Sequence, residues 1–143
     1  MTKEFHIEHK ISIAAPIEKV FAVLCDVEKW SEWTKSIKKT ELITSGGFKV
    51  GAKIKIYQPR LLPAVWTVTE ISQNRVIWTK DSPGLKVNAT HILESTNDGT
   101  SFVNSITFEG FLAALVLQVS RSLTKKYIAM EANGLKNVCE AVK

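Results

Sequence analysis

The sequence contains few of the residues on which disulfide-stabilised and membrane-spanning proteins depend. Its 143 residues include two cysteines, Cys25 and Cys139, which lie far apart and form no Cys-x-x-Cys motif. We expect two reduced thiols, as is usual in the cytoplasm. The longest apolar run, residues 111–117, is too short to cross a bilayer, and residues 1–6 contain no apolar signal core. The sequence therefore predicts a cytoplasmic protein without a transmembrane segment.

Familiar catalytic and metal-binding motifs are also missing. The sequence has no HExxH, P-loop or GxSxG motif. His6 and His9 are three residues apart on a predicted strand and point to opposite faces, while His91 has no Cys, Asp or Glu at ligand spacing. Glu70 shares the register of the inward-facing Trp66, but it lies at a strand end where solvent is expected. We therefore predict no metal ion and no cofactor.

The formal charge of +5 is distributed along the chain. The basic residues form two loose groups. These are Lys35, Lys38 and Lys39, and then Arg121, Lys125 and Lys126. Proteins that bind nucleic acids usually concentrate positive charge and place exposed aromatic residues between the cations. The aromatic residues here lie in apolar-patterned segments instead, so a nucleic-acid partner is not expected.

Hydrophobic periodicity predicts an α+β domain that spans residues 1–143. Alternating apolar residues and short turns predict six to seven antiparallel strands. The strand segments are 5–13, 37–43, 52–58, 64–71, 76–80, 85–94 and 101–109. Pro16 fits the first turn of a short helix that continues to Leu24, and Asp26 is expected to cap a second one with Trp30 and Trp33.

A long helix is predicted over residues 111–142. Its apolar stripe comprises Leu112, Leu115, Val116, Val119, Leu123, Tyr127, Met130, Gly134, Val138 and Ala141. This helix is the only element long enough to cover the apolar face of the sheet. A strongly curved sheet contacts one helix along a limited line, which leaves room for an apolar pocket beside it.

The chain resembles the START-like, helix-grip superfamily, and within it the polyketide cyclase/dehydrase-like branch. The resemblance includes the opening segment 11–21, followed by Asp26, Trp30 and Trp33. It continues through segments 58–66, 82–84 and 127–136 and through His91, so that it spans nearly the whole chain. It implies a helix-grip fold and a START-like ligand-binding domain. Because the superfamily includes lipid carriers, hormone receptors, cyclases and chaperone cofactors, the resemblance does not define one activity.

Three polar residues interrupt the predicted inner face of the sheet: Gln58, His91 and Asn104. Each needs a hydrogen-bond partner, because burying it unpaired costs about 1–3 kcal/mol. The partner is either a polar atom of a ligand or a neighbouring group of the protein. For His91 the sequence favours neither interpretation, whereas for Gln58 and Asn104 a structural role is favoured.

The other candidate binding residues lie beside these three. Arg60, between Pro59 and Pro63, either reaches across the pocket mouth towards an anionic group or is a solvated loop residue. The hydroxyl of Tyr127 either points into the pocket or caps the core. The remaining candidates are apolar or aromatic wall residues. These are Trp66, Trp78, Val87, Ile106, Leu115 and Val119.

Three functions are compatible with this sequence. The preferred one is the binding of a small hydrophobic or amphipathic molecule of lipid, polyketide or isoprenoid type. The first alternative is a cyclase- or dehydratase-like enzyme that uses His91 as its acid or base. The second is a protein-interaction module. The surplus apolar residues Phe111, Ala114 and Leu117 further predict a pocket entrance, a homodimer contact or a surface covered by a neighbouring loop.

Overall fold

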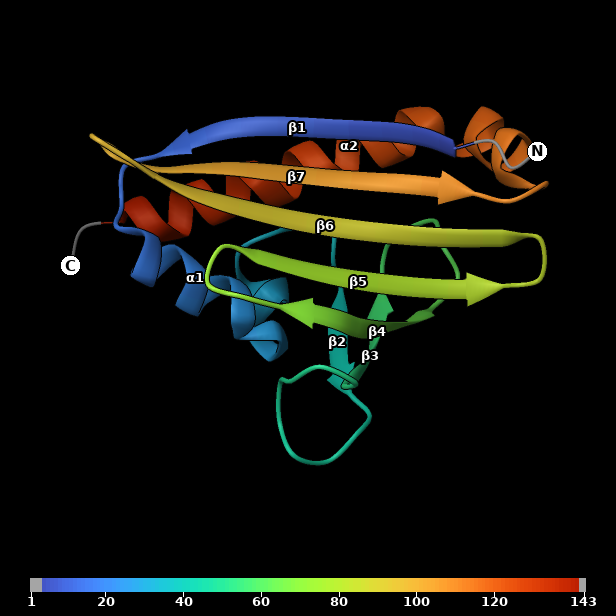
Figure 1. The fold of residues 1–143 in the computed structure, drawn as a ribbon, viewed down its shortest axis with the longest axis horizontal. Helices are drawn as coiled ribbons and strands as arrows, with labels where there is room; N and C mark the ends of the chain where they lie inside the picture. Colours follow the sequence, from blue (N-terminus) through green and yellow to red (C-terminus); the bar gives the residue numbers. More distant parts are fainter. Residues whose placement is uncertain (1–3, 142–143) are drawn as a thin grey trace.

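A computed structural model describes residues 4–141 of the chain and shows one curved antiparallel sheet against one long helix. Seven strands lie in the order β1-β7-β6-β5-β4-β3-β2 (Figure 1). They are β1 (Glu4–Ile13), β2 (Lys39–Leu42), β3 (Lys53–Tyr57), β4 (Ala64–Ile71), β5 (Arg75–Ser82), β6 (Leu85–Thr96) and β7 (Gly99–Glu109). The α+β class and the strand number agree with the sequence-based prediction.

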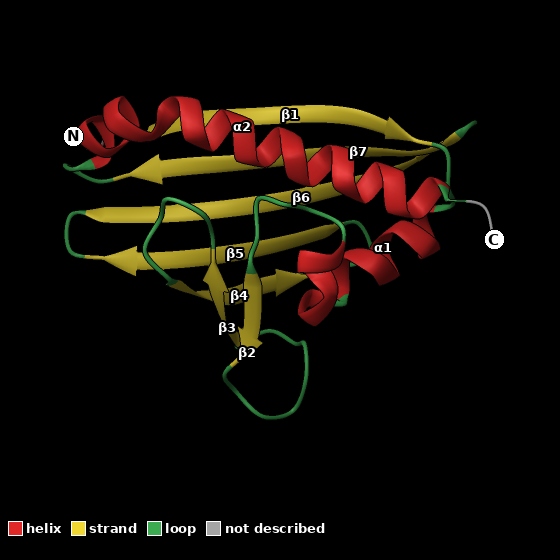
Figure 2. Cartoon of the chain, turned by 180° about the vertical axis from the view of Figure 1, so that it is seen from behind, coloured by secondary structure: helices red, strands yellow, loops and turns green. Residues whose placement is uncertain are grey.

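The helices lie on one face of the sheet. The helix α2 (Ala113–Glu140) runs across this face, and α1 (Ile17–Cys25) lies near the C-terminal end of α2 (Figure 2). The 3-10 helix η1 (Val27–Glu32) follows α1 and carries the buried Trp30. Within residues 4–141, no helix combines the length and the apolar character that a membrane crossing requires. The end predicted for the long helix, residue 142, lies outside the described residues.

The inner register predicted from alternation is correct over most of the sheet. Trp78, His91 and Asn104 are buried on the side that faces α2. His91 pairs directly with Asn104 between β6 and β7, and Trp78 pairs with Ala89 between β5 and β6. A shift of one residue would turn all of these side chains towards solvent, so the apolar face itself determines the register.

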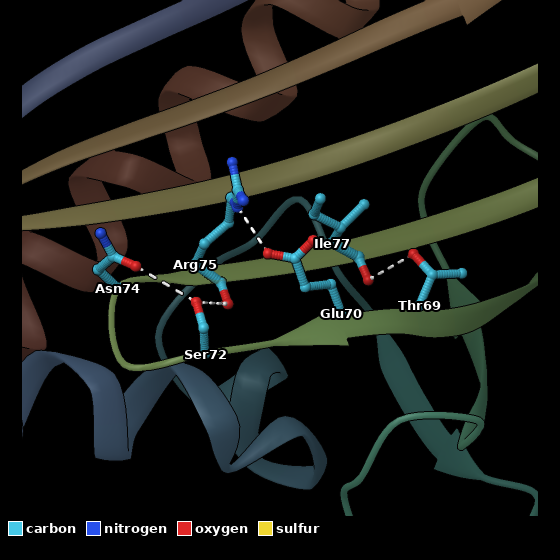
Figure 3. Close-up of polar contacts among 6 residues, drawn as sticks. All are labelled: Thr69, Glu70, Ser72, Asn74, Arg75 and Ile77. Atoms are coloured by element: carbon cyan, nitrogen blue, oxygen red, sulfur yellow. Dashed lines mark hydrogen bonds and ion pairs between the residues drawn. The ribbon is translucent and has the colours of Figure 1, made fainter.

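The register changes at a bulge in β4. Before the bulge Val68 pairs with Trp78 on the inner face, whereas after it Glu70 pairs with Ile77 on the outer face. The Glu70 carboxylate therefore faces outward, where it accepts a hydrogen bond from Arg75 Nε at 2.7 Å (Figure 3). The expectation that Glu70 shares the face of Trp66 is wrong, because one extra residue in the strand reverses the alternation beyond it.

The phase of α2 differs from the prediction at its N-terminal end. Leu115 and Val119 were expected to face the sheet but are 59% and 81% exposed. Leu117 was expected to point elsewhere but is only 2% exposed and packs in a cluster with Ile7 and Phe108. A run of seven apolar residues fits any face of a helix, so periodicity could not determine its phase there. The phase follows instead from inward-facing residues further along α2.

The ends of several helices and strands differ slightly from the prediction. Pro16 occupies the N-cap of α1 rather than its first turn, and Asp26 occupies the N-cap of η1 without a side-chain capping bond. The strand predicted over residues 37–43 is shorter in the structure, where β2 runs from Lys39 to Leu42. The predicted end of the helical stripe, Ala141, lies just beyond the last turn of α2.

Gly134 permits a close approach between α2 and the segment after η1. A Cβ atom at this position would collide with the Trp33 carbonyl oxygen. Although glycine is unfavourable inside a helix, it is the residue that fits this contact. The close approach places Trp33 beside the C-terminal half of α2, one turn from Glu131, which belongs to the site described below.

The observed phase of α2 can be tested with a pair of lysine substitutions. We expect Leu117→Lys to lower the free energy of unfolding by about 3 kcal/mol or more, because it places an unpaired charge in a packed cluster. Val119→Lys should change it by less than about 0.5 kcal/mol, because this side chain already faces solvent. Urea denaturation of both variants measures the difference. Equal destabilisation by the two changes would contradict this helix phase.

Candidate ligand-binding cavity

A cavity of about 590 Å³ lies between the sheet and α2. Its walls come from β3 to β7, from α2 and from the loop that joins β3 to β4. Most of the residues around it are apolar or aromatic, including Trp66, Val87, Ile106 and Phe108. The volume falls within the range of roughly 300–1,000 Å³ that is usual for small-molecule sites.

The mouth and the inner end of the cavity differ in exposure. All of the exposed residues in the lining belong to the loop segment Arg60–Pro63. The lining residues Trp30, Ile37, His91 and Asn104 are buried. The cavity therefore opens beside the β3–β4 loop and ends at a group of buried aromatic and polar side chains.

The structure brings most of the predicted binding residues together. The cavity lining includes Gln58, Arg60, Trp66, Trp78, Val87, His91, Asn104, Ile106 and Tyr127. Leu115 and Val119 are not among its residues, because the N-terminal part of α2 turns them towards solvent. Val116, Ser120 and Leu123 occupy the corresponding places on the helix.

A chain of hydrogen bonds crosses the inner end of the cavity. Trp78 Nε1 donates to His91 Nδ1 at 3.2 Å, and His91 also bonds to the side chain of Asn104. Asn104 Nδ2 then donates to the Ile128 carbonyl oxygen at 3.0 Å and to Glu131 Oε1 at 3.3 Å. This chain links β5, β6 and β7 to the middle of α2.

His91 is held in its neutral form. Because the indole N–H of Trp78 can only donate, Nδ1 of His91 accepts and the ring proton lies on Nε2. Burial lowers the pKa of His91 to about 4, although the hydrogen bond with Asn104 opposes this shift. Since Nδ1 accepts from Trp78, Nε2 is the nitrogen that would exchange a proton in the acid–base role that the sequence suggested, and the lowered pKa makes the imidazole a weak base.

Glu131 is an acidic cavity residue that the sequence analysis missed. Its carboxyl accepts from Asn104 and bonds to the side chain of Ser36. Burial raises its pKa to about 7, while the bonds to Asn104 and Ser36 work against this rise. The available signal was its spacing of four from Tyr127, which puts both residues on one face of α2.

Two side chains fix the loop at the mouth. The hydroxyl of Tyr127 donates to the Pro59 carbonyl oxygen, and Gln58 Nε2 donates to the Ser36 carbonyl oxygen at 3.2 Å. Both sequence-predicted candidates therefore use polar atoms to hold the protein's own backbone. Arg60 lies at the tip with a φ of 67°, a conformation that is uncommon for a residue with a side chain.

Trp30 has a larger role than the sequence suggested. It was not among the predicted binding residues, yet it lines the cavity. Its Nε1 donates to the Leu24 carbonyl oxygen at 2.9 Å, and its ring meets Trp78 edge to face at 5.1 Å between ring centres. Trp33 packs against Trp30 but does not line the cavity.

The fold and the cavity define a START-like, helix-grip domain. The polyketide cyclase/dehydrase and lipid transport family matches residues 4–140, and the chain belongs to this family. Among curated proteins, none matches the chain in sequence.

Solved structures with the same fold are distant in sequence. The Zhui aromatase/cyclase from Streptomyces sp. R1128 aligns with a TM-score of 0.72 at 15% identity, covering 96% of this chain and 94% of that one. A protein from Thermus thermophilus aligns with a TM-score of 0.73 at 17% identity, covering 94% and 95%. Norcoclaurine synthase from Thalictrum flavum gives 0.76 at 13% identity, covering 97% and 96%. At these identities the likeness establishes the fold alone.

The opposite pKa shifts of His91 and Glu131 predict a specific pH dependence of stability. Glu131 binds a proton more tightly in the folded state, so its contribution to stability is present at low pH and is lost as the pH rises from about 4.5 to about 7. His91 binds a proton less tightly when folded, so its contribution falls as the pH drops from 6.5 towards about 4. In the overlapping range, the two effects oppose each other.

Glu131→Gln should therefore stabilise the protein more at pH 8 than at pH 5. Replacing the carboxyl removes the cost of ionising it in the cavity, so the gain relative to wild type should grow by roughly 2–3 kcal/mol between these pH values. Urea unfolding of both proteins at pH 5 and pH 8 measures this change. A gain that is independent of pH would show that Glu131 titrates at an ordinary value.

Proposed function

We propose that the protein binds a small hydrophobic or amphipathic molecule, of lipid, polyketide or isoprenoid type, in the cavity between the sheet and α2. The observation that carries this proposal is a cavity of about 590 Å³ with mainly apolar walls and a mouth at the β3–β4 loop. A well-packed core leaves few voids larger than a water molecule. A space of this size and lining supports ligand binding over the protein-interaction module, for which a closed core would be expected.

A second candidate function is cyclase- or dehydratase-like catalysis, and one observation favours it. The Glu131 carboxyl lines the cavity, and its pKa of about 7 suits proton transfer at neutral pH. This assigns the acid–base role to Glu131 rather than to His91. The Zhui protein, described as an aromatase/cyclase, shares the fold and lends this candidate support by analogy only.

Two further expectations from the sequence stay predictions. A cytoplasmic location follows from the composition and sequence patterns described above. The homodimer contact predicted at the start of α2 from Phe111, Ala114 and Leu117 now depends on Phe111 and Ala114, which are exposed. Leu117 cannot contribute to that contact, because it is buried within the domain.

Binding can be tested with the neutral fluorescent probe N-phenyl-1-naphthylamine. We expect saturable binding with a blue-shifted emission, because the probe would move from water into an apolar cavity. Ala89→Phe should weaken binding at least about tenfold, because Ala89 lines the cavity and a phenyl ring would occupy part of its volume.

The matched control is Thr90→Phe on the opposite face of the same strand, which should leave the affinity unchanged. Circular dichroism confirms that both variants fold. If the probe does not bind to the wild type, or if both variants bind it as the wild type does, the cavity is not the binding site.

A further inference from the structure

The polar inner end of the cavity contains a carboxyl group without a positive partner. Glu131 lies one turn from Tyr127 on α2, and it bonds to Asn104 on β7 and to Ser36 after η1. Among the described residues, no basic side chain forms an ion pair with it. Buried carboxylates are normally paired with a cation or neutralised by a proton.

The hydrogen-bond partners of Glu131 suit its ionised form. The amide nitrogen of Asn104 can only donate, so it stabilises a carboxylate oxygen. Ser36 bonds to the carboxyl and also to Thr34, whose Oγ1 lies 2.7 Å from Ser36 Oγ. Two neutral groups of the protein thus stabilise the anion, and the component that is missing is an opposite charge.

That charge would have to come from the cavity side. The basic residues in the lining are Arg60 and Lys80, and neither affects the pKa of Glu131. Of the titratable groups near Glu131, His91 on β6 is neutral and Tyr127 on α2 cannot carry positive charge. The indole rings of Trp30, Trp66 and Trp78 line the same cavity, and indole faces attract cations.

We propose that the cavity selects ligands with an apolar body and a protonated amine, and that the Glu131 carboxylate binds this amine at the inner end. This inference rests on the proposed binding function and names the chemical class of its ligand. The alternative is a carbonyl ligand that accepts a hydrogen bond from protonated Glu131. The two ligand classes differ in their pH dependence, because the amine requires the ionised carboxyl and the carbonyl requires the protonated one.

Competition against bound N-phenyl-1-naphthylamine at pH 8 tests the ligand class. The competitors are decylamine, decanol, 2-decanone and decanoate, which have the same chain length and different end groups. We expect decylamine to bind at least about tenfold more tightly than decanol, because a carboxylate and an ammonium group attract strongly in a desolvated site. Decanoate should bind most weakly.

Glu131→Gln should remove the preference for decylamine, so that decylamine and decanol bind to this variant with similar affinity. The matched control, Glu94→Gln, changes an exposed residue of β6 and should retain the preference. In the wild type, the affinity for decylamine should rise about tenfold from pH 6 to pH 8, because the ionised fraction of Glu131 increases while the amine stays protonated. This measurement remains decisive even if Glu131→Gln does not fold.

The outcomes separate this inference from the proposed function. Probe binding with equal affinities for decylamine and decanol would contradict amine selection and leave the binding function intact. A decylamine preference that survives in Glu131→Gln, or 2-decanone binding most tightly at pH 6, would also overturn the inference. Failure of the wild type to bind any of these molecules would contradict both proposals.

Discussion

The arrangement of the site depends on the side-chain amide of Asn104. From the middle of β7, its nitrogen reaches α2 by bonding to the Ile128 carbonyl oxygen and to Glu131. Since both amide hydrogens are used in this way, its oxygen is left to accept the proton on His91 Nε2. The orientation of one amide therefore matches the His91 tautomer that Trp78 determines, positions the Glu131 carboxyl and ties the sheet to the helix. Loss of this amide would leave several buried polar groups without partners at once.

The cavity follows from the geometry of one helix against a curved sheet. Near its C-terminal end, α2 packs tightly, with buried Ala132, Leu135 and Cys139 in the main core. Towards its N-terminus it packs against β1, β6 and β7 through Leu117 in a second cluster. Between these two contacts the sheet curves away, and the small side chains of Ala64 and Ala89 do not fill the space. Tyr127 and Gln58 then hold the β3–β4 loop at the open side.

The sequence predicted what depends on strict alternation and missed what depends on three-dimensional context. Period two correctly placed Trp78, His91 and Asn104 on the inner face, because a slip would expose the whole apolar set. It failed at Glu70, where a bulge that leaves no trace in hydrophobicity reverses the face. Helical periodicity failed at Leu115 and Val119, because the uniformly apolar run 111–117 does not show which side of the helix faces the sheet. Glu131 was missed for a different reason: polar residues on a helix are usually solvated, and its cavity position depends on how α2 packs.

The same desolvation that creates the binding space also controls its charge. Burial disfavours an ion of either sign, so it lowers the pKa of His91 and raises that of Glu131. At neutral pH, His91 is therefore uncharged, whereas Glu131 is divided between its protonated and ionised forms. A ligand that supplies a positive charge would lower the pKa of Glu131 and favour its carboxylate form. It would not have this effect on His91, which is neutral and accepts a hydrogen bond from Trp78. At the polar end of the cavity, the charge of Glu131 can therefore change when a ligand binds, whereas His91 stays neutral. This difference makes the carboxyl on α2, rather than the imidazole on β6, the group most able to recognise a ligand.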